Sequence, residues 1–157
     1  MTCTMGISIG PRCGFAFHIV KEGKLSATVT GAWQPFVGRM NRATQVAAMN
    51  ATLAPFFALG IDKAYIGPAG LHVESAGLAD VVKSICSRER VPFAEVSGAE
   101  WRKDFCGRTR ANIGEVRDAC RARNFEPASH EEAAAIGIAS AGIEMAAEAA
   151  YAAQLAA

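Results

Sequence analysis

The run Met5-Gly6-Ile7-Ser8-Ile9-Gly10 is the stretch that most constrains how this chain can fold. It is short and apolar, with the small polar residue Ser8 near its middle, which is typical of a strand buried on both faces of a sheet. Pro11 and the glycines at positions 10 and 14 then favour a tight turn into a second strand. The sequence therefore predicts a central strand that leads directly into an antiparallel partner.

The hydrophobic period after this run is first that of strands and then that of helices. Residues 13–20 and 25–33 predict the second and third strands, joined by a turn at Gly23. Apolar spacings of three and four residues then predict a helix from near Phe36 to between Pro55 and Gly60. Further along the chain we expect a strand over residues 61–67, a helix over 75–88 and a strand over 91–96.

The second half of the chain is predicted to be mainly helical. Ser97 with Glu100 and Ser129 with Glu132 form two capping-box patterns, each of which marks the start of a helix. Between them a helix is expected from about 110 to 123, and an alanine-rich helix follows over about 129–155. The predicted fold class is α/β, one domain of residues 1–157 with a mixed five-stranded sheet, three antiparallel strands and then parallel ones, flanked by helices.

Composition and charge exclude several classes of protein. The 157 residues are 51% hydrophobic and 20% charged, which indicates a globular domain and excludes a disordered one. A formal net charge of +1 provides no global attraction to nucleic acid or membranes, so such binding must come from local clusters. We find no apolar run of membrane-spanning length and no signal peptide, and expect no membrane partner. The five cysteines lack a C-x-x-C pair, which predicts reduced thiols and no zinc site.

Five segments, spread over roughly residues 5 to 145, carry motif-like patterns. They are GISIGPRCGF at 6–15, IDKAYIG at 61–67, AEWRK at 99–103, the basic run 107–123 and HEEAAAI at 130–136. In this order they resemble the motifs of the RuvC-type Holliday-junction resolvases, and particularly the compact phage-type members. The resemblance implies a ribonuclease-H-like fold, a phage-encoded protein, and a location in the cytoplasm of the bacterial host cell or in the virion.

The resemblance also implies where catalytic acids would stand. The family hydrolyses phosphodiester bonds with two Mg²⁺ ions, which need several converging carboxylates. By the resemblance, the first aspartate position is Ser8, the glutamate position at the end of the fourth strand is Gly67, and the last aspartate position is Ala134. Only Glu131, three residues before Ala134, keeps a carboxylate. We therefore expect a degenerate catalytic site without a metal, with Mg²⁺ as a cofactor only if residual activity persists.

Basic residues gather in the second half of the chain. Arg110, Arg117 and Arg121 are seven and four residues apart, so a helix over 110–123 would place them on one stripe. In the family the matching loop and helix lie along the DNA backbone, where arginine suits phosphate contacts. A solvated helix face with Glu115 and Asp118 as local partners is the alternative. The candidate DNA-binding residues are Arg102, Lys103, Arg108, Arg110, Arg117 and Arg121.

Three functions stay open at this point. The first is a catalytically inactive, resolvase-like protein that keeps a structural role or a role on branched or double-stranded DNA. The second is a protein-interaction module, for example a virion component, whose small-residue terminal helix supports a homodimer or a larger assembly. The third is an active branched-DNA endonuclease with a relocated metal site built from Glu131, Glu74 and His130.

Overall fold

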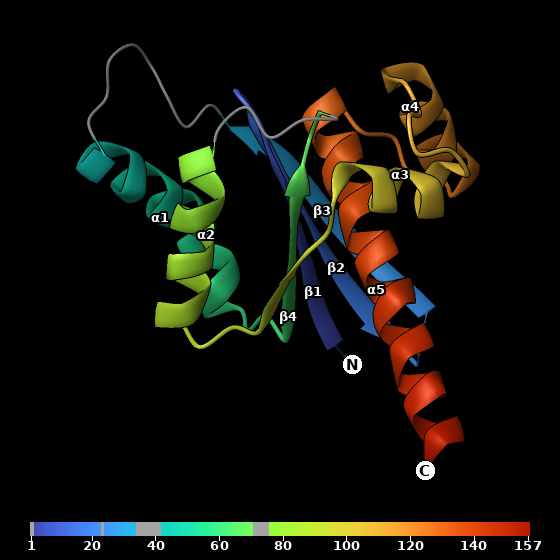
Figure 1. Ribbon diagram of the computed structural model, residues 1–157. Coiled ribbons are helices and arrows are strands. Elements are labelled where there is room, and N and C mark those ends of the chain that lie inside the picture. Colours follow the sequence, from blue (N-terminus) through green and yellow to red (C-terminus); the bar gives the residue numbers. More distant parts are fainter. Residues whose placement is uncertain (1, 23, 34–41, 71–75) are drawn as a thin grey trace.

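The computed structural model describes residues 2–22, 24–33, 42–70 and 76–157 (Figure 1). The predicted turn at Gly23, the helix start near Phe36 and the start of the next helix at Ser75 lie outside these ranges. The described elements are β1 (Thr2–Ile9), β2 (Cys13–Lys21), β3 (Lys24–Trp33), α1 (Arg42–Ala58), β4 (Lys63–Pro68), α2 (Ala76–Arg88), β5 (Phe93–Glu95), α3 (Gly98–Cys106), α4 (Ile113–Ala122) and α5 (His130–Ala156).

The five strands form one mixed sheet in the order β3-β2-β1-β4-β5, with β1 at its centre. β1 pairs antiparallel with β2 and parallel with β4, β2 pairs antiparallel with β3, and β4 pairs parallel with β5. The predicted fold class, three antiparallel strands followed by parallel strands with helices on both faces, is confirmed. The Ser97 capping box is present with both of its hydrogen bonds, and Ser129 caps α5 by accepting from the Glu132 N–H.

Helices cover both faces of the sheet, α1 and α2 on one and α3, α4 and α5 on the other (Figure 1). Successive side chains of β1 point to opposite faces of the sheet, as in any pleated strand. Met5, Ile7 and Ile9 are buried in the core with α1 and α2. Gly6 and Ser8 face α5, which explains why small residues interrupt the apolar run.

The α5 helix lies unusually close to the sheet. A Cβ atom at Gly6 would stand 2.3 Å from the carbonyl oxygen of Ala135, and one at Gly142 would stand 2.3 Å from the Tyr65 ring. From His130 to Gly142 the helix is mostly buried, whereas from Glu144 onward it is largely exposed and extends past the sheet (Figure 1). The small residues of the first half of α5 therefore serve packing within the chain.

The apolar character of α5 also bears on the expectation that no segment has membrane-spanning length. By length and composition alone, α5 is long and apolar enough to cross a membrane. The sequence analysis did not predict this. Half of the relevant window is buried inside the protein, as in the core helix of a soluble domain. Packing on the sheet thus accounts for the apolar residues of that half.

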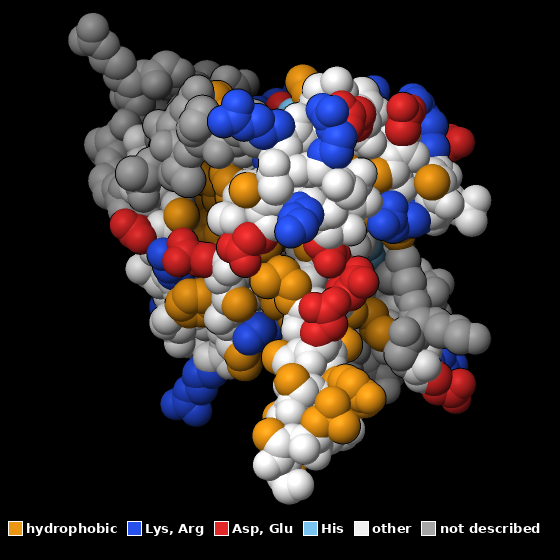
Figure 2. All heavy atoms as spheres, turned by 45° about the vertical axis from the view of Figure 1, so that its right-hand side comes forward, with side chains coloured by type: hydrophobic (Ala, Val, Ile, Leu, Met, Phe, Trp, Pro, Cys, Tyr) orange, Lys and Arg blue, Asp and Glu red, His pale blue; other side chains and the backbone are white. Residues whose placement is uncertain are grey.

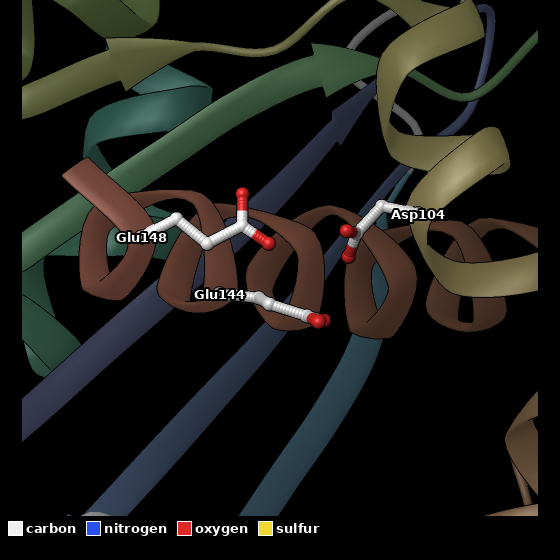
Figure 3. A group of neighbouring side chains, drawn as sticks. All are labelled: Asp104, Glu144 and Glu148. Atoms are coloured by element: carbon white, nitrogen blue, oxygen red, sulfur yellow. The ribbon is translucent and has the colours of Figure 1, made fainter. Parts of the chain in front are cut away.

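Three carboxylates meet where α3 packs against α5. Asp104 of α3 and Glu144 and Glu148 of α5 bring oxygen atoms within 4.8 Å of one another (Figure 3). Burial, a hydrogen bond to Glu144 and the negative charges of Glu144 and Glu148 raise the pKa of Asp104 to about 6, against the opposing charge of Arg123. Asp104 and Glu144 are therefore held together best when a proton lies between them.

The close approach of α5 predicts a strong effect of adding one methyl group at Gly6. Gly6→Ala would force the helix away from the backbone of Ala135, so we expect a loss of about 1–3 kcal/mol in the free energy of unfolding, measured by urea denaturation. Gly114→Ala is the control, because Gly114 is exposed on α4 and meets only the Asn112 side chain. Equal stability of the Gly6→Ala variant and the wild type would show that α5 does not pack as described.

The raised pKa of Asp104 predicts a pH-dependent stability difference. The unfolded chain ionises Asp104 near pH 4, whereas the folded chain resists ionisation up to about pH 6, so ionised Asp104 destabilises the fold at higher pH. We expect Asp104→Asn to melt at a higher temperature than the wild type above about pH 6. The gain should shrink as the pH falls from about 6 toward 4. Asp118→Asn, at an exposed position on α4, is the control, and a gain independent of pH would contradict the shared proton.

Candidate functional site

The three positions that were predicted to have lost acids gather around the centre of the sheet and the start of α5. Ser8 of β1 lies opposite Gly67 of β4 in the parallel ladder and opposite Gly14 of β2 in the antiparallel ladder. Ala134 is fully buried on α5, one turn before Ile138, whose side chain lies against Gly67. The sequence interpretation placed Ser8 on the first strand and Gly67 at the end of the fourth, and the register makes the two residues direct partners.

The Ser8 hydroxyl is fully buried and is used to hold the fold together. Its Oγ donates to the carbonyl oxygen of Glu131 at 2.8 Å and accepts from the backbone N–H of Gly14 at 3.0 Å. One small side chain thus joins β1, β2 and the first turn of α5. An ionised aspartate at position 8 would have only acceptors to present to the Glu131 carbonyl, so it could not make the first of these bonds.

Gly67 stands where there is little room for a longer side chain. A Cβ atom there would lie 2.9 Å from the carbonyl oxygen of Val96 and 3.1 Å from the nearest side-chain carbons of Ile138. Beside it, at the carboxyl ends of the central strands, a cavity of about 390 Å³ is lined mainly by apolar groups and by two acids. Glu95 is paired with Lys83 at 2.7 Å, and Glu100 accepts from the Ser97 N–H in the capping box.

The residues of the proposed relocated metal site are only partly brought together. Glu131 is half-buried at the start of α5, next to His130. Nε2 of His130 lies 3.2 Å from the carbonyl oxygen of Ala69. Because a carbonyl oxygen can only accept a hydrogen bond, Nε2 is the nitrogen that is protonated when the ring is neutral. Burial and the positive charges of Arg102 and Arg117 lower the pKa of His130, although the Ala69 carbonyl and Glu131 oppose them. Glu74, the third member, lies outside the described residues.

Arg102, expected to contact DNA, is instead a buried structural residue. Only 3% of it is exposed, and its guanidinium stacks on the Trp101 ring, 4.2 Å from the ring centroid. Burial lowers its pKa. The guanidinium donates to four backbone carbonyls at 2.7–3.3 Å, those of Ala69, Gly70, Gly98 and Ala111. Because these carbonyls use its donors, Arg102 pins the segment after β4 to α3 and to the loop before α4, and this structural role counts against the expected DNA contact, which stays a prediction.

The remaining basic candidates lie at or near the surface, but not on one stripe. Asn112 caps α4 by accepting from the Glu115 N–H at 2.9 Å, so the helix begins at Ile113 and Arg110 belongs to the preceding loop. Only Arg117 and Arg121 are on α4 itself. An asparagine three residues before a glutamate is a capping signal that could have corrected the predicted helix start.

Two of these arginines have acidic partners, as the alternative interpretation expected. Arg108 pairs with Glu115 at 3.0 Å and Arg121 pairs with Asp118 at 3.3 Å. Figure 2 shows the side of the molecule on which α3, α4 and α5 lie. Basic and acidic side chains are interspersed over its upper part, and further acidic side chains lie below them. Lys103 and Arg110 are exposed, and within the described chain neither makes an ion pair.

Arg117 differs from the other candidates because it is half-buried. Its Nε atom is buried and has no hydrogen-bond partner among the described residues. With Arg121, Glu126 and Pro127 it lines a cavity of about 360 Å³. The sequence interpretation missed this cavity, which forms between α4 and the segment that follows it. It also missed the carboxylates of Asp104, Glu144 and Glu148, because they come together from segments about forty residues apart in the chain.

Comparison with known proteins shows similarity at the level of the fold. No protein-family model matches the chain, and no curated protein sequence matches it significantly. The structure of Thermus thermophilus RuvC is similar with a TM-score of 0.72 and 15% identity, covering 89% of this chain and 92% of that one. T. thermophilus RuvC in complex with a Holliday junction substrate gives a TM-score of 0.69 and 15% identity over 90% and 92% of the two chains.

A viral resolvase shows the same architecture at lower identity. The Fowlpox virus resolvase in complex with Holliday junction DNA matches with a TM-score of 0.55 and 9% identity, covering 92% of this chain and 98% of that one. The five-stranded sheet of this protein therefore has the ribonuclease-H-like fold of RuvC, and the chain is structurally similar to Holliday-junction resolvases.

Proposed function

We propose that this protein binds branched or double-stranded DNA without cleaving it, as a resolvase-like protein that has lost its metal-binding acids. The observation that carries the proposed loss of cleavage is the buried Ser8 hydroxyl. It donates its hydrogen bond to the Glu131 carbonyl at the centre of the sheet. Two of the structures with the same fold are complexes with Holliday junctions, which supports branched DNA as the ligand. Phage origin and a location in the host cytoplasm or the virion belong to the same proposal.

The residues at the centre of the sheet do not fit a two-metal site. Mg²⁺ takes oxygen ligands, chiefly carboxylates, and two such ions in one pocket need several anions around them. Ser8 offers one hydroxyl that is already engaged, Gly67 has no side chain, and Ala134 is a buried methyl group. Glu131 alone remains, and one carboxylate cannot hold two Mg²⁺ ions close together.

DNA binding in this proposal rests on the exposed basic residues. Lys103 and Arg110 lie on α3 and on the loop between α3 and α4, and both are free to meet phosphates. With a net charge of only +1, affinity must come from a few such contacts. Mg²⁺ or Mn²⁺ would then be dispensable for binding.

A protein-interaction or virion role is the second candidate function. The ion pairs of Arg108 and Arg121 favour it, because they neutralise two of the expected DNA contacts. The exposed second half of α5 favours it as well, since Tyr151 is 63% and Leu155 is 70% exposed. This candidate predicts normal folding and no measurable affinity for DNA.

The described residues at the centre of the sheet do not fit a two-metal site, so the proposal predicts no metal-dependent cleavage. Purified protein incubated with four-way junctions and Mg²⁺ or Mn²⁺ should leave the strands intact on a denaturing gel. Glu131→Gln is the matched variant, because it removes the one retained carboxylate. Metal-dependent cutting by the wild type that disappears in Glu131→Gln would overturn the proposal in favour of the relocated metal site.

The exposed basic residues predict a salt-dependent affinity that falls when they are removed. The double variant Lys103→Ala/Arg110→Ala should bind junction DNA more weakly in a gel-shift titration. Its plot of log affinity against log salt should be flatter by about one for each phosphate that the variant no longer binds. Arg88→Ala is the control, since Arg88 is exposed on α2 at the opposite face of the sheet. No binding by the wild type, or equal weakening in both variants, would favour the interaction role instead.

A further inference from the structure

A polar cavity opens between strand β3 and the segment that joins α4 to α5. Its volume is about 490 Å³, which is within the range of small-molecule sites. Thr28 and Thr30 of β3 line one side, residues 123–127 line the other, and the buried Ile136 of α5 also contributes. None of the small residues at the centre of the sheet lines this cavity, and neither candidate function uses it.

The wall opposite β3 is fixed by the turn that ends α4. Asn124 adopts the left-handed conformation with a φ of 63°, which asparagine tolerates better than most residues. Its N–H bonds to the Arg121 carbonyl, and the Phe125 N–H bonds to the Cys120 carbonyl, which are the two hydrogen bonds of a Schellman motif. The motif sets the direction of the chain after α4. Phe125 and Glu126 therefore line the cavity as parts of an ordered turn.

The β3 wall offers a hydroxyl donor because of the histidine that Thr28 contacts. His18 of β2 is only 1% exposed, its Nδ1 atom lies 2.7 Å from the Thr28 hydroxyl, and its Nε2 atom has no hydrogen-bond partner among the described residues. Burial lowers the pKa of His18 to about 4, so the ring carries one proton at pH 7. A buried N–H without an acceptor is rarer than a buried acceptor without a donor, which assigns this proton to Nδ1. The Thr28 hydroxyl then accepts from His18 and keeps its own proton for a ligand.

Arg123 and Glu126 bring a donor group and an acceptor group to the other wall. The Arg123 guanidinium lies 4.1 Å from the centroid of the Phe105 ring and donates one N–H to the Ala119 carbonyl at 3.0 Å. Its other N–H groups stay available. Glu126 is exposed and makes no ion pair within the described ranges, so both of its oxygens are open to a ligand. The opposite charges cancel, which fits a neutral polar ligand better than a phosphate.

We propose that this cavity binds an unpaired guanine base. Guanine carries two adjacent donors, its N1–H and its N2 amino group, which match the two oxygens of the Glu126 carboxylate. On its other edge it carries the acceptors O6 and N7, which an arginine contacts with two N–H groups. Arg123 supplies those groups here, Phe125 supplies an aromatic ring on which a base stacks, and Thr28 adds a further donor.

The same groups discriminate against adenine. On the corresponding edge adenine has an amino group beside an unprotonated ring nitrogen, so one Glu126 oxygen would face a lone pair. Next to its N7 it carries an amino donor, which would face the Arg123 donors. The ligand is therefore a purine with the donor and acceptor pattern of guanine.

Two sources offer the same base, a free guanine nucleotide and an unpaired guanine in a nucleic-acid strand. Both present the same edges and the same ring to the cavity. This inference does not depend on the proposed DNA binding, which uses α3 and the loop before α4. A failure of junction binding would leave the base site untouched, because a free nucleotide needs neither of those elements.

Isothermal titration calorimetry with guanosine monophosphate tests the site. The wild type should bind one nucleotide per chain. Inosine monophosphate, which lacks the N2 amino group, should bind about ten-fold more weakly, and adenosine monophosphate at least as weakly as that. Glu126→Gln should weaken guanosine monophosphate about ten-fold and remove its advantage over inosine monophosphate, because a glutamine offers one acceptor in place of two. Glu89→Gln is the control, since Glu89 follows α2 on the opposite face of the sheet and loses the same charge.

Thymine oligonucleotides with and without one central guanine separate the two sources. Tighter binding of the strand with the guanine, lost in Glu126→Gln, would identify a nucleic-acid strand as a source of the base. Binding of guanosine monophosphate alone would identify the free nucleotide.

Three outcomes would overturn the proposal. The first is no binding of guanosine monophosphate together with equal affinity for the two oligonucleotides. The second is inosine or adenosine monophosphate binding as tightly as guanosine monophosphate. The third is an unchanged affinity in Glu126→Gln, or an equal loss in Glu89→Gln, when circular dichroism shows both variants to be folded.

Discussion

The contact between the first turns of α5 and the centre of the sheet is the interaction on which the rest of the structure depends. It is nearly a backbone-to-backbone contact, since Gly6 and Gly14 leave no room for a Cβ atom beneath the helix. Ser8 completes it with a hydrogen bond to the Glu131 carbonyl. Because α3 and α4 pack on α5, their position over the sheet follows from this one close approach.

The same contact explains why the centre of the sheet suits structure and not metal chemistry. A metal site needs acceptor atoms that converge on an open space, whereas here a hydroxyl proton points at a carbonyl in a closed one. Gly67 lies against Val96 and Ile138, so a longer side chain there would displace the segment after β5 or α5 itself. Restoring the acids one at a time would therefore cost packing before it produced a complete ligand set.

Much of this arrangement could be predicted from the sequence, because it depends on local patterns. The apolar runs and capping boxes placed the strands and the starts of α3 and α5, whereas the start of α4 was predicted three residues too early. The expectation that positions 8, 67 and 134 lack acids came from the resemblance to the resolvases and stays a prediction. Arg102 could not be placed this way. Its partners are backbone carbonyls, which leave no mark on the sequence, and two of them belong to Ala69 and Gly70, more than thirty residues earlier. A basic pattern cannot tell such a buried arginine from an exposed one.

The misplaced helix start changes how the basic surface should be understood. With Asn112 as the cap, Arg110 lies on a loop and Arg117 is half-buried on α4, so no continuous stripe of arginines runs along one helix. In addition, Arg108 and Arg121 are each paired with an acidic side chain, Arg108 with Glu115 and Arg121 with Asp118. Any phosphate contacts must then be few and set by the shape of α3 and the following loop. A protein of this kind would recognise DNA by geometry, because too little charge remains for strong non-specific attraction.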